Sequence, residues 1–223
     1  MKNNKFLWIV SFIPLIITLI VLQFLPDKVP MHYDMAGNID RWGSKYEQFI
    51  FPVTILGLSF MWQCMISYFE KKSENGENEK QRAEANSNVK ILRLVAVAMA
   101  VVFGIMHIVS MYSAYIEAVN MKEQSVIEIN VVVNILWAVV LIIVGNYMPK
   151  AKRNAVVGFR TKKSLSDDAV WRKTNRFAGI TLMIAGVLII IETLLVRGML
   201  STVLMVAILL IMAVADLVYA ARL

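Results

Sequence analysis

The feature that most constrains this chain is a series of six apolar blocks, each about as long as a helix that crosses a bilayer. They are Phe6–Leu25, Phe49–Phe69, Ile91–Tyr115, Val126–Met148, Gly179–Val196 and Met199–Tyr219. About 20 helical residues span the ~30 Å of hydrocarbon in a membrane. An unpaired backbone amide in lipid costs several kcal/mol, so a span must be a helix or a strand of a closed barrel. The blocks lack the alternating polar and apolar residues of barrel strands, so we expect helices. The sequence therefore predicts an all-α fold, a polytopic membrane helix bundle with six transmembrane helices.

Composition agrees with a membrane location. The chain is 58% hydrophobic, whereas soluble domains contain about 45–50% apolar residues. The formal charge of +7 falls between the apolar blocks, so we expect the partner of these charges to be the lipid bilayer, with no direct binding of nucleic acid. The first block is longer than the ~7–15 apolar residues of a signal peptide, and we expect it to be an uncleaved span.

The basic residues divide unevenly between the two sides of such a bundle. Of the 23 lysines and arginines, 18 lie at the two termini and in the second and fourth connections, and five lie in the other connections. Short loops rich in Lys and Arg stay in the cytoplasm. We therefore expect a multi-pass protein of the plasma membrane with cytoplasmic N and C termini.

The first outer loop, PDKVPMHYDMAGNIDRWGSK, combines turn formers with aromatic and charged side chains. Gly37 and Asn38 predict a tight turn. Two interpretations of the loop remain open. It is either an interfacial cap with Trp42 and Tyr33 at headgroup depth, or an outward recognition surface.

The fourth connection, at 149–178, is basic and aromatic, and it reads NAVVGFRTKKSLSDDAVWRKTNRFAG from Asn154 to Gly179. Ser164 with Asp167 fits a capping box, and the apolar spacing that follows predicts a helix along the inner headgroups. Whether the segment is a membrane anchor or a dock for a partner stays open. The polar second connection, at 70–90, is expected to be a flexible cytoplasmic linker.

Catalytic and metal chemistry are not expected. The sequence shows no nucleophile with an adjacent base, and His32 and His107 lie in different parts of the chain. We therefore predict no enzyme, no catalytic residues, no metal and no cofactor. A small transporter or channel is the alternative function, because polar residues inside spans mark transport pathways. The candidates are His107, Asn130, Asn134, Glu192 and Asp216.

Two stretches resemble a known family of bacterial membrane proteins. The segment GNYMPKAKRNAVVGFRTKKSLSDDAVWRKTNRFAG is similar to the signature of the SdpI family of immunity proteins, and the first outer loop is similar to a DUF1648 segment. The signature positions are Asn146, Met148, Pro149, Asn154, Gly158, Arg160, Thr161, Leu165, Ser166, Trp171, Thr174, Arg176 and Gly179. The outer positions are Pro30, His32, Gly37, Asp40, Trp42, Gly43 and Lys45.

The chain departs from the family pattern at two places. Lys162 and Lys163 stand where the family usually has Pro-Trp, and Asn175 stands where it often has His. Because Asn does not titrate near neutral pH, a role that needs an ionisable group there is in doubt. We include Asn175 among the candidate residues of the cytoplasmic signature.

The resemblance implies an architecture and a function. It implies a DUF1648-like segment at 1–69, the linker at 70–90, and an SdpI-like four-span region at 91–223. The implied function is immunity against a secreted antimicrobial peptide toxin that binds on the outer face. In one branch of the family the protein also sequesters a cytoplasmic autorepressor at the bacterial cell membrane.

Overall fold

Long helices and one small hairpin make up the computed structural model, which describes residues 4–34, 36–153, 158–196 and 198–223. The elements are α1 (Lys5–Val21), β1 (Lys28–Tyr33), β2 (Ile39–Ser44), the 3-10 helix η1 (Lys45–Phe49), α2 (Ile50–Asn75), α3 (Glu79–Val119), α4 (Ile129–Tyr147), the 3-10 helix η2 (Met148–Lys150), α5 (Asp168–Val196) and α6 (Gly198–Arg222). The predicted all-α membrane bundle is confirmed, with a two-stranded hairpin added to it.

Five helical stretches within the described residues are long and apolar enough to cross a membrane. They are Lys45–Asn75, α3, Ile129–Lys150, α5 and α6. The sixth, α1, has 17 residues, or about 25 Å of helix. Its last turn continues irregularly, since the amides of Leu22 and Leu25 still donate to Thr18 O and Val21 O at 2.9 and 3.2 Å. The regular helix therefore ends at Val21, before the apolar block does.

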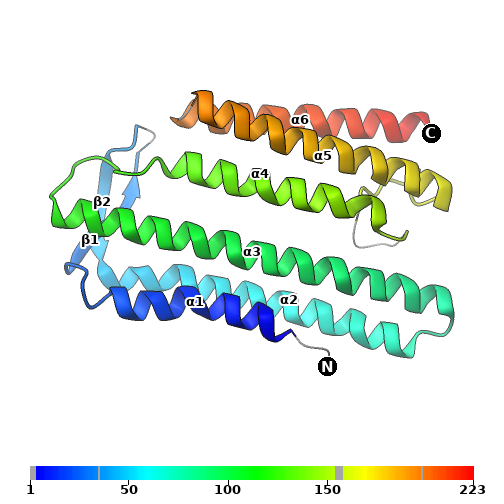
Figure 1. Cartoon of the computed structure of the whole chain (residues 1–223), viewed down its shortest axis with the longest axis horizontal. Coiled ribbons are helices and arrows are strands. Elements are labelled where there is room, and N and C mark those ends of the chain that lie inside the picture. The colour runs from blue at the N-terminus through cyan, green and yellow to red at the C-terminus, as the bar shows by residue number, and fades with distance from the viewer. Residues whose placement is uncertain (1–3, 35, 154–157, 197) are drawn as a thin grey trace.

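The helices form two groups, with α1, α2 and α3 on one side of the bundle and α4, α5 and α6 on the other (Figure 1). The hairpin, the α3–α4 connection, the last turn of α5 and the first turn of α6 lie at one end of the bundle. The α2–α3 turn, the segment before α5 and the C-terminus lie at the other end. The connections that the basic residues assign to the cytoplasm are thus gathered at one end, called the inner end below.

Polar side chains within the spans pair across helices. The Thr18 hydroxyl on α1 lies 2.7 Å from His107 Nε2 on α3, and Thr181 Oγ1 donates to Asp216 Oδ1 at 2.8 Å. Asn134 on α4 donates to Ser201 Oγ on α6 at 2.7 Å. Three of the polar candidates inside the spans, His107, Asn134 and Asp216, thus have hydrogen-bond partners on neighbouring helices.

Residues 70–90 differ from the expected flexible linker, because most of them are helical. Only the turn around Gly76 separates α2 from α3, and Asn78 Oδ1 caps α3 by accepting from Gln81 N at 2.9 Å. Ala85 and Val89 pack against Ile66 and Phe69 of α2. The interpretation failed because two small apolar residues one turn apart bury enough surface against a neighbouring helix.

Candidate functional site

The turn between β1 and β2 is held by one aspartate. Asp34 Oδ1 accepts from the amides of Ala36 and Asn38, both at 2.8 Å, and Asp34 Oδ2 accepts from Asn38 Nδ2 at 2.8 Å. These bonds, chiefly the one from the Asn38 side chain, lower the pKa of Asp34. Gly37 has φ +84°, a conformation that side chains rarely adopt. The predicted tight turn is confirmed.

The hairpin is joined to the bundle through Glu117, which is 0% exposed at the outer end of α3. Its carboxylate accepts from Tyr33 Oη at 2.6 Å, Ser113 Oγ at 2.5 Å and Val126 N at 2.8 Å. Burial, and then the bond to Glu117, raise the pKa of the Tyr33 hydroxyl above its ordinary value. A buried carboxylate needs such donors, so β1, α3 and the α3–α4 connection are tied at one point.

The α3–α4 connection adds a third segment to the hairpin. Ile39 N donates to Glu123 O at 2.9 Å, and Ser125 N donates to Gly37 O at 2.8 Å. Gln124 Nε2 donates to Asn38 Oδ1 at 3.0 Å. We call residues 28–44 with 123–125 the outer platform. Because the hairpin is bonded to the α3–α4 connection through its backbone and through Asn38, the platform has a fixed position on the bundle.

The exposed face of the outer platform carries Trp42, which is 41% exposed. His32 Nδ1 lies 2.7 Å from Asp40 Oδ1. Arg41 pairs with Glu47 at 3.0 Å. The predicted outer residues therefore lie together, with aromatic and charged groups facing outward.

The other predicted outer residues shape the platform. Pro30 is buried and lies opposite Trp42 in the strand register. A Cβ on Gly43 would lie 2.3 Å from Glu47 Oε1, so a side chain there would displace that carboxylate. Lys45 pairs with Asp27 at 3.0 Å. These three positions are explained by packing and pairing within the hairpin.

A cavity of about 730 Å³ lies between the outer platform and the outer ends of α4, α5 and α6. Tyr33 and Gln124 line it from the platform, and Asn130, Val196 and Gly198 line it from the helices. The cavity is a second outer feature that the sequence did not indicate.

At the inner end, the indole of Trp171 is the centre of the basic and aromatic segment. Trp171 is 1% exposed, and its Nε1 donates to Ala151 O at 2.8 Å. Ile91 of α3 packs against Trp171 and Ala151. The predicted helix along the headgroups is therefore not what the structure shows. Trp171 belongs to the first turn of α5 and is buried in protein, where its N–H finds a carbonyl.

Asn175 and Gly158 complete the same cluster. Asn175 Oδ1 accepts from Phe159 N at 2.8 Å, and its Nδ2 donates to Trp171 O at 3.1 Å. Gly158 has φ +114°, and a Cβ there would lie 2.5 Å from Asn175 Oδ1. Asn175 thus has a structural role that uses both a donor and an acceptor, and this role does not require a titrating group.

A compact turn precedes α5. Ser164 Oγ accepts from Thr161 N at 2.8 Å and donates to Phe159 O at 3.0 Å. The cap of α5 is Asp167, whose Oδ1 accepts from Ala169 N at 2.6 Å. The predicted capping box at Ser164 is therefore wrong, because that hydroxyl is used inside the turn.

Glycines allow α4 and α5 to meet at backbone distance beside this cluster. A Cβ on Gly145 would lie 2.7 Å from Gly179 O, and one on Gly179 would lie 2.6 Å from Gly145 O. Small residues at such positions allow close packing of membrane helices. The signature glycine at 179 is thereby explained, and its partner Gly145 was missed in the sequence.

The remaining signature residues lie around this cluster. Thr174 is buried and donates to Val170 O at 2.9 Å, whereas Arg153 pairs with Asp168 at 2.6 Å. The exposed signature residues are Asn146, Pro149, Arg160, Leu165, Ser166 and Arg176. Asn154 lies outside the described residues. The buried members hold the segment together, and the exposed members lie on its surface.

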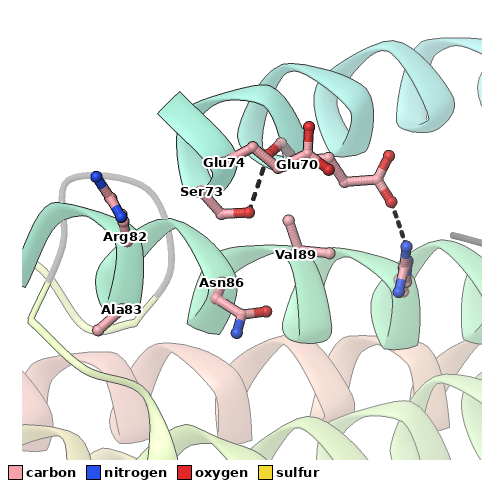
Figure 2. Close-up of a pocket in the computed structure, with 8 residues that line it drawn as sticks. Glu70, Ser73, Glu74, Arg82, Ala83, Asn86 and Val89 are labelled. Carbon is pink, nitrogen blue, oxygen red and sulfur yellow. Dashed lines mark hydrogen bonds and ion pairs between the residues drawn. The ribbon is translucent and has the colours of Figure 1, made fainter. Parts of the chain in front are cut away.

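A polar cavity of about 300 Å³ lies between α2 and α3 at the inner end (Figure 2). Glu70 and Glu74 line it from α2, and Arg82 and Asn86 line it from α3. Glu70 forms an ion pair with Arg93, and Arg82 Nε donates to Gly76 O at 2.8 Å. Both charge signs are present, so the cavity carries no single-sign field for a ligand.

Comparison with known proteins identifies both regions. Residues 150–220 match the model of the SdpI/YfhL protein family, and residues 9–56 match DUF1648, a domain of unknown function. The chain is 23% identical over 189 residues to the protein named immunity protein SdpI of Bacillus subtilis (strain 168), covering 85% of this chain and 80% of that protein. The SdpI-family resemblance is confirmed. The matched SdpI region contains the Trp171 cluster, and the DUF1648 match contains the hairpin.

These matches and the apolar helices make this a multi-pass protein of the bacterial cell membrane. No solved structure matches the chain. The boundaries at 69, 90 and 91 stay a prediction. The roles of the outer and signature residues in recognition also stay predictions.

Proposed function

We propose that this protein is an integral membrane immunity protein that protects its cell against a secreted antimicrobial peptide toxin, which it contacts with the outer platform. The similarity to a protein named immunity protein supports the class of function. The observation that carries the recognition step is the fixed, outward-facing set of Trp42, His32 and Asp40 beside a large outer cavity. Aromatic residues on a rigid support are effective binding anchors.

The outer contact is coupled to the inner end by α3. Glu117 on this helix holds the platform, and Ile91 on the same helix packs against Trp171. The two residues are separated by 26 positions of uninterrupted helix, or about 39 Å. A displacement of the platform therefore moves the surface on which the signature segment rests.

The inner end then presents the signature segment to a cytoplasmic autorepressor. Lys162, Lys163 and Arg172 are exposed on it, so the surface that the repressor meets is basic and lies on a buried Trp171 cluster. Toxin contact outside would change the position of this surface and retain the repressor at the membrane. Immunity genes would then be expressed.

Deletion and complementation test the immunity function. Cells without the gene are expected to be killed by peptides that related cells secrete, and the wild-type gene is expected to restore growth. Trp42→Ala is expected to abolish protection, whereas Tyr46→Ala, an exposed aromatic beside the hairpin, is expected to retain it. Full protection by Trp42→Ala at normal abundance would exclude the platform as the contact.

A photo-crosslinking residue at position 42 tests direct contact, and a transcriptional reporter tests signalling. The crosslinker is expected to capture a small secreted peptide in exposed cells. A double Lys162→Gln and Lys163→Gln variant is expected to protect cells but to lose induction of a reporter fused to the gene's own promoter. Unchanged induction in that variant would remove the basic surface from the mechanism.

A further inference from the structure

Four polar side chains form a hydrogen-bond chain near the outer ends of α4, α5 and α6. Asn134 Nδ2 donates to Ser201 Oγ at 2.7 Å, and Ser201 Oγ donates to Thr193 Oγ1 at 3.2 Å. Thr193 Oγ1 donates to Glu192 Oε1 at 3.1 Å. Every donor in the chain is directed toward the carboxylate, so its acceptor end is Glu192. Such a group inside a span is a candidate functional site.

Two oxygens of this chain are buried and have no partner in the described part of the protein. They are Asn134 Oδ1 and Glu192 Oε2. Asn134, Thr193 and Ser201 are themselves almost fully buried. An unpaired carboxylate oxygen is costly to bury, and each such atom in a folded protein requires an explanation. Both free oxygens are acceptors, so the missing group is a donor or a cation.

The chain lies one helical turn below the outer cavity. Asn130 and Val196 line that cavity, and Asn134 and Glu192 follow them one turn deeper on the same helix faces. The cavity of about 730 Å³ has polar groups from the platform on its other side. The residues that carry the two free oxygens therefore lie about one helical turn, or ~5 Å along each helix axis, below residues that line the cavity.

We propose that Glu192 and Asn134, with the hydroxyls of Ser201 and Thr193, bind a small monovalent cation such as Na⁺. The donor set consists of carboxylate, amide and hydroxyl oxygens, which suit hard cations and not soft metals. One carboxylate neutralises one positive charge. A divalent ion would leave a net charge in a region of low dielectric, which is costly. Each hydroxyl oxygen has two lone pairs and accepts one hydrogen bond in this chain, so one lone pair is left to bind the ion.

Occupancy of this site connects α4 to the α5–α6 pair at the outer end. A ligand that binds only the folded state stabilises that state, and the stabilisation increases with the ligand concentration. The inference does not depend on the immunity function, since it rests on side chains that the platform does not use.

Thermal unfolding of the purified full-length chain in detergent tests the site. At constant ionic strength, replacing choline chloride by NaCl is expected to raise the Tm saturably, by about 5 °C when Na⁺ is ~100 times its Kd. Glu192→Gln is expected to remove the shift. Glu77→Gln makes the same charge change at an exposed position of the inner end and is expected to retain it. An identical Tm in both salts would overturn the proposal.

A direct measurement covers the case in which Glu192→Gln does not fold. Equilibrium binding of radioactive sodium to the wild-type chain is expected to saturate near one ion per chain, and Thr193→Val is expected to weaken it about tenfold. Absence of saturable binding would indicate that water alone fills the site. Arg197 lies outside the described residues. If wild type binds no sodium and Arg197→Gln gains binding, the arginine is the native partner of Glu192 and the proposal is wrong.

Discussion

The outer platform and the inner signature segment are built from the same kinds of residue but use them in opposite ways. Each contains a tryptophan, a glycine with positive φ and a side chain that accepts from backbone amides. In the platform Trp42 is 41% exposed, whereas in the signature segment Trp171 is 1% exposed. Composition therefore does not tell a recognition surface from a structural cluster.

The two tryptophans differ in exposure because α3 presents a different side chain at each of its ends. At the outer end α3 supplies Glu117, which binds Tyr33 and leaves Trp42 outside. At the inner end α3 supplies Ile91, which packs on the indole of Trp171. The platform is thus held by a hydrogen bond from Tyr33 to a carboxylate, which leaves Trp42 exposed. The signature segment is held by an apolar contact with Trp171, which buries that tryptophan. Five experiments test this contrast.

The largest effect is expected from the two tryptophans. Trp171→Ala should destabilise the protein by about 3–5 kcal/mol, because it leaves a cavity and an unpaired Ala151 carbonyl. Trp42→Ala should change stability by no more than about 0.5 kcal/mol. Unfolding in detergent, followed by denaturant titration, measures both. Equal losses would contradict the contrast.

The two positive-φ glycines should differ in the same direction. Gly158→Ala combines backbone strain with contacts to Asn175 and Trp171, and we expect a loss of about 3 kcal/mol. Gly37 has no atom within 4 Å of an added Cβ, so Gly37→Ala should lose only about 1 kcal/mol. Tm values of the two variants provide the comparison, and a larger loss at Gly37 would refute it.

Removal of one hydroxyl tests the platform contact. Tyr33→Phe should lose about 1.5–3 kcal/mol, since the bond is to a charged, buried acceptor. Tyr46→Phe, on an exposed ring, is the matched control and should be neutral. Proteolysis of the hairpin in reconstituted vesicles should be accelerated only in Tyr33→Phe. Equal cleavage rates would show that Glu117 does not hold the platform.

Alkaline titration tests the same contact without a change in packing. The folded pKa of Tyr33 is raised above the ordinary value of about 10. The contact therefore contributes its full stabilisation below that pH and loses it as pH rises through the folded pKa. Subtracting the titration of Tyr33→Phe from that of the wild type gives the phenolate absorbance of Tyr33 alone. This absorbance should appear only at a pH above the range in which ordinary tyrosines titrate. A normal titration for that residue would be inconsistent with burial against Glu117.

The smallest effect is expected at the exposed pair on the platform. The side chains of His32 and Asp40 are 65% and 44% exposed, so Asp40→Asn should change stability by less than about 0.5 kcal/mol. Its effect on toxin protection should be much larger if the pair takes part in recognition. Tm and survival assays on one variant separate the two quantities, and a large fall in Tm would assign the pair to the fold.

Much of the bundle could be predicted from the sequence, because lipid leaves few choices for a 20-residue apolar block. The tight turn at Gly37 was also predictable from its residue type. Glu117 was not, because a single acid near the end of an apolar block also fits an ordinary span boundary. Its role depends on Tyr33, which lies 84 residues earlier, and no local pattern shows that contact.

The signature segment shows the same limit. Apolar residues at helical spacing predict a helix face that is buried away from water, but they do not indicate whether lipid or protein covers that face. Trp171 was interpreted as lying at the headgroups, and the structure buries it against Ala151 and Ile91. The hydrogen-bond chain ending at Glu192 was likewise hidden, since three separate helices contribute to it.

The length of α3 has a further consequence for access from the cytosol. Residues 79–90 precede its apolar block, and 12 residues of helix measure about 18 Å. The polar headgroup layer on one side of a bilayer is only about 5–8 Å deep. The tip of the α2–α3 hairpin at Gly76 thus extends into bulk solution beyond the phosphates, where a soluble macromolecule can reach it without touching the membrane.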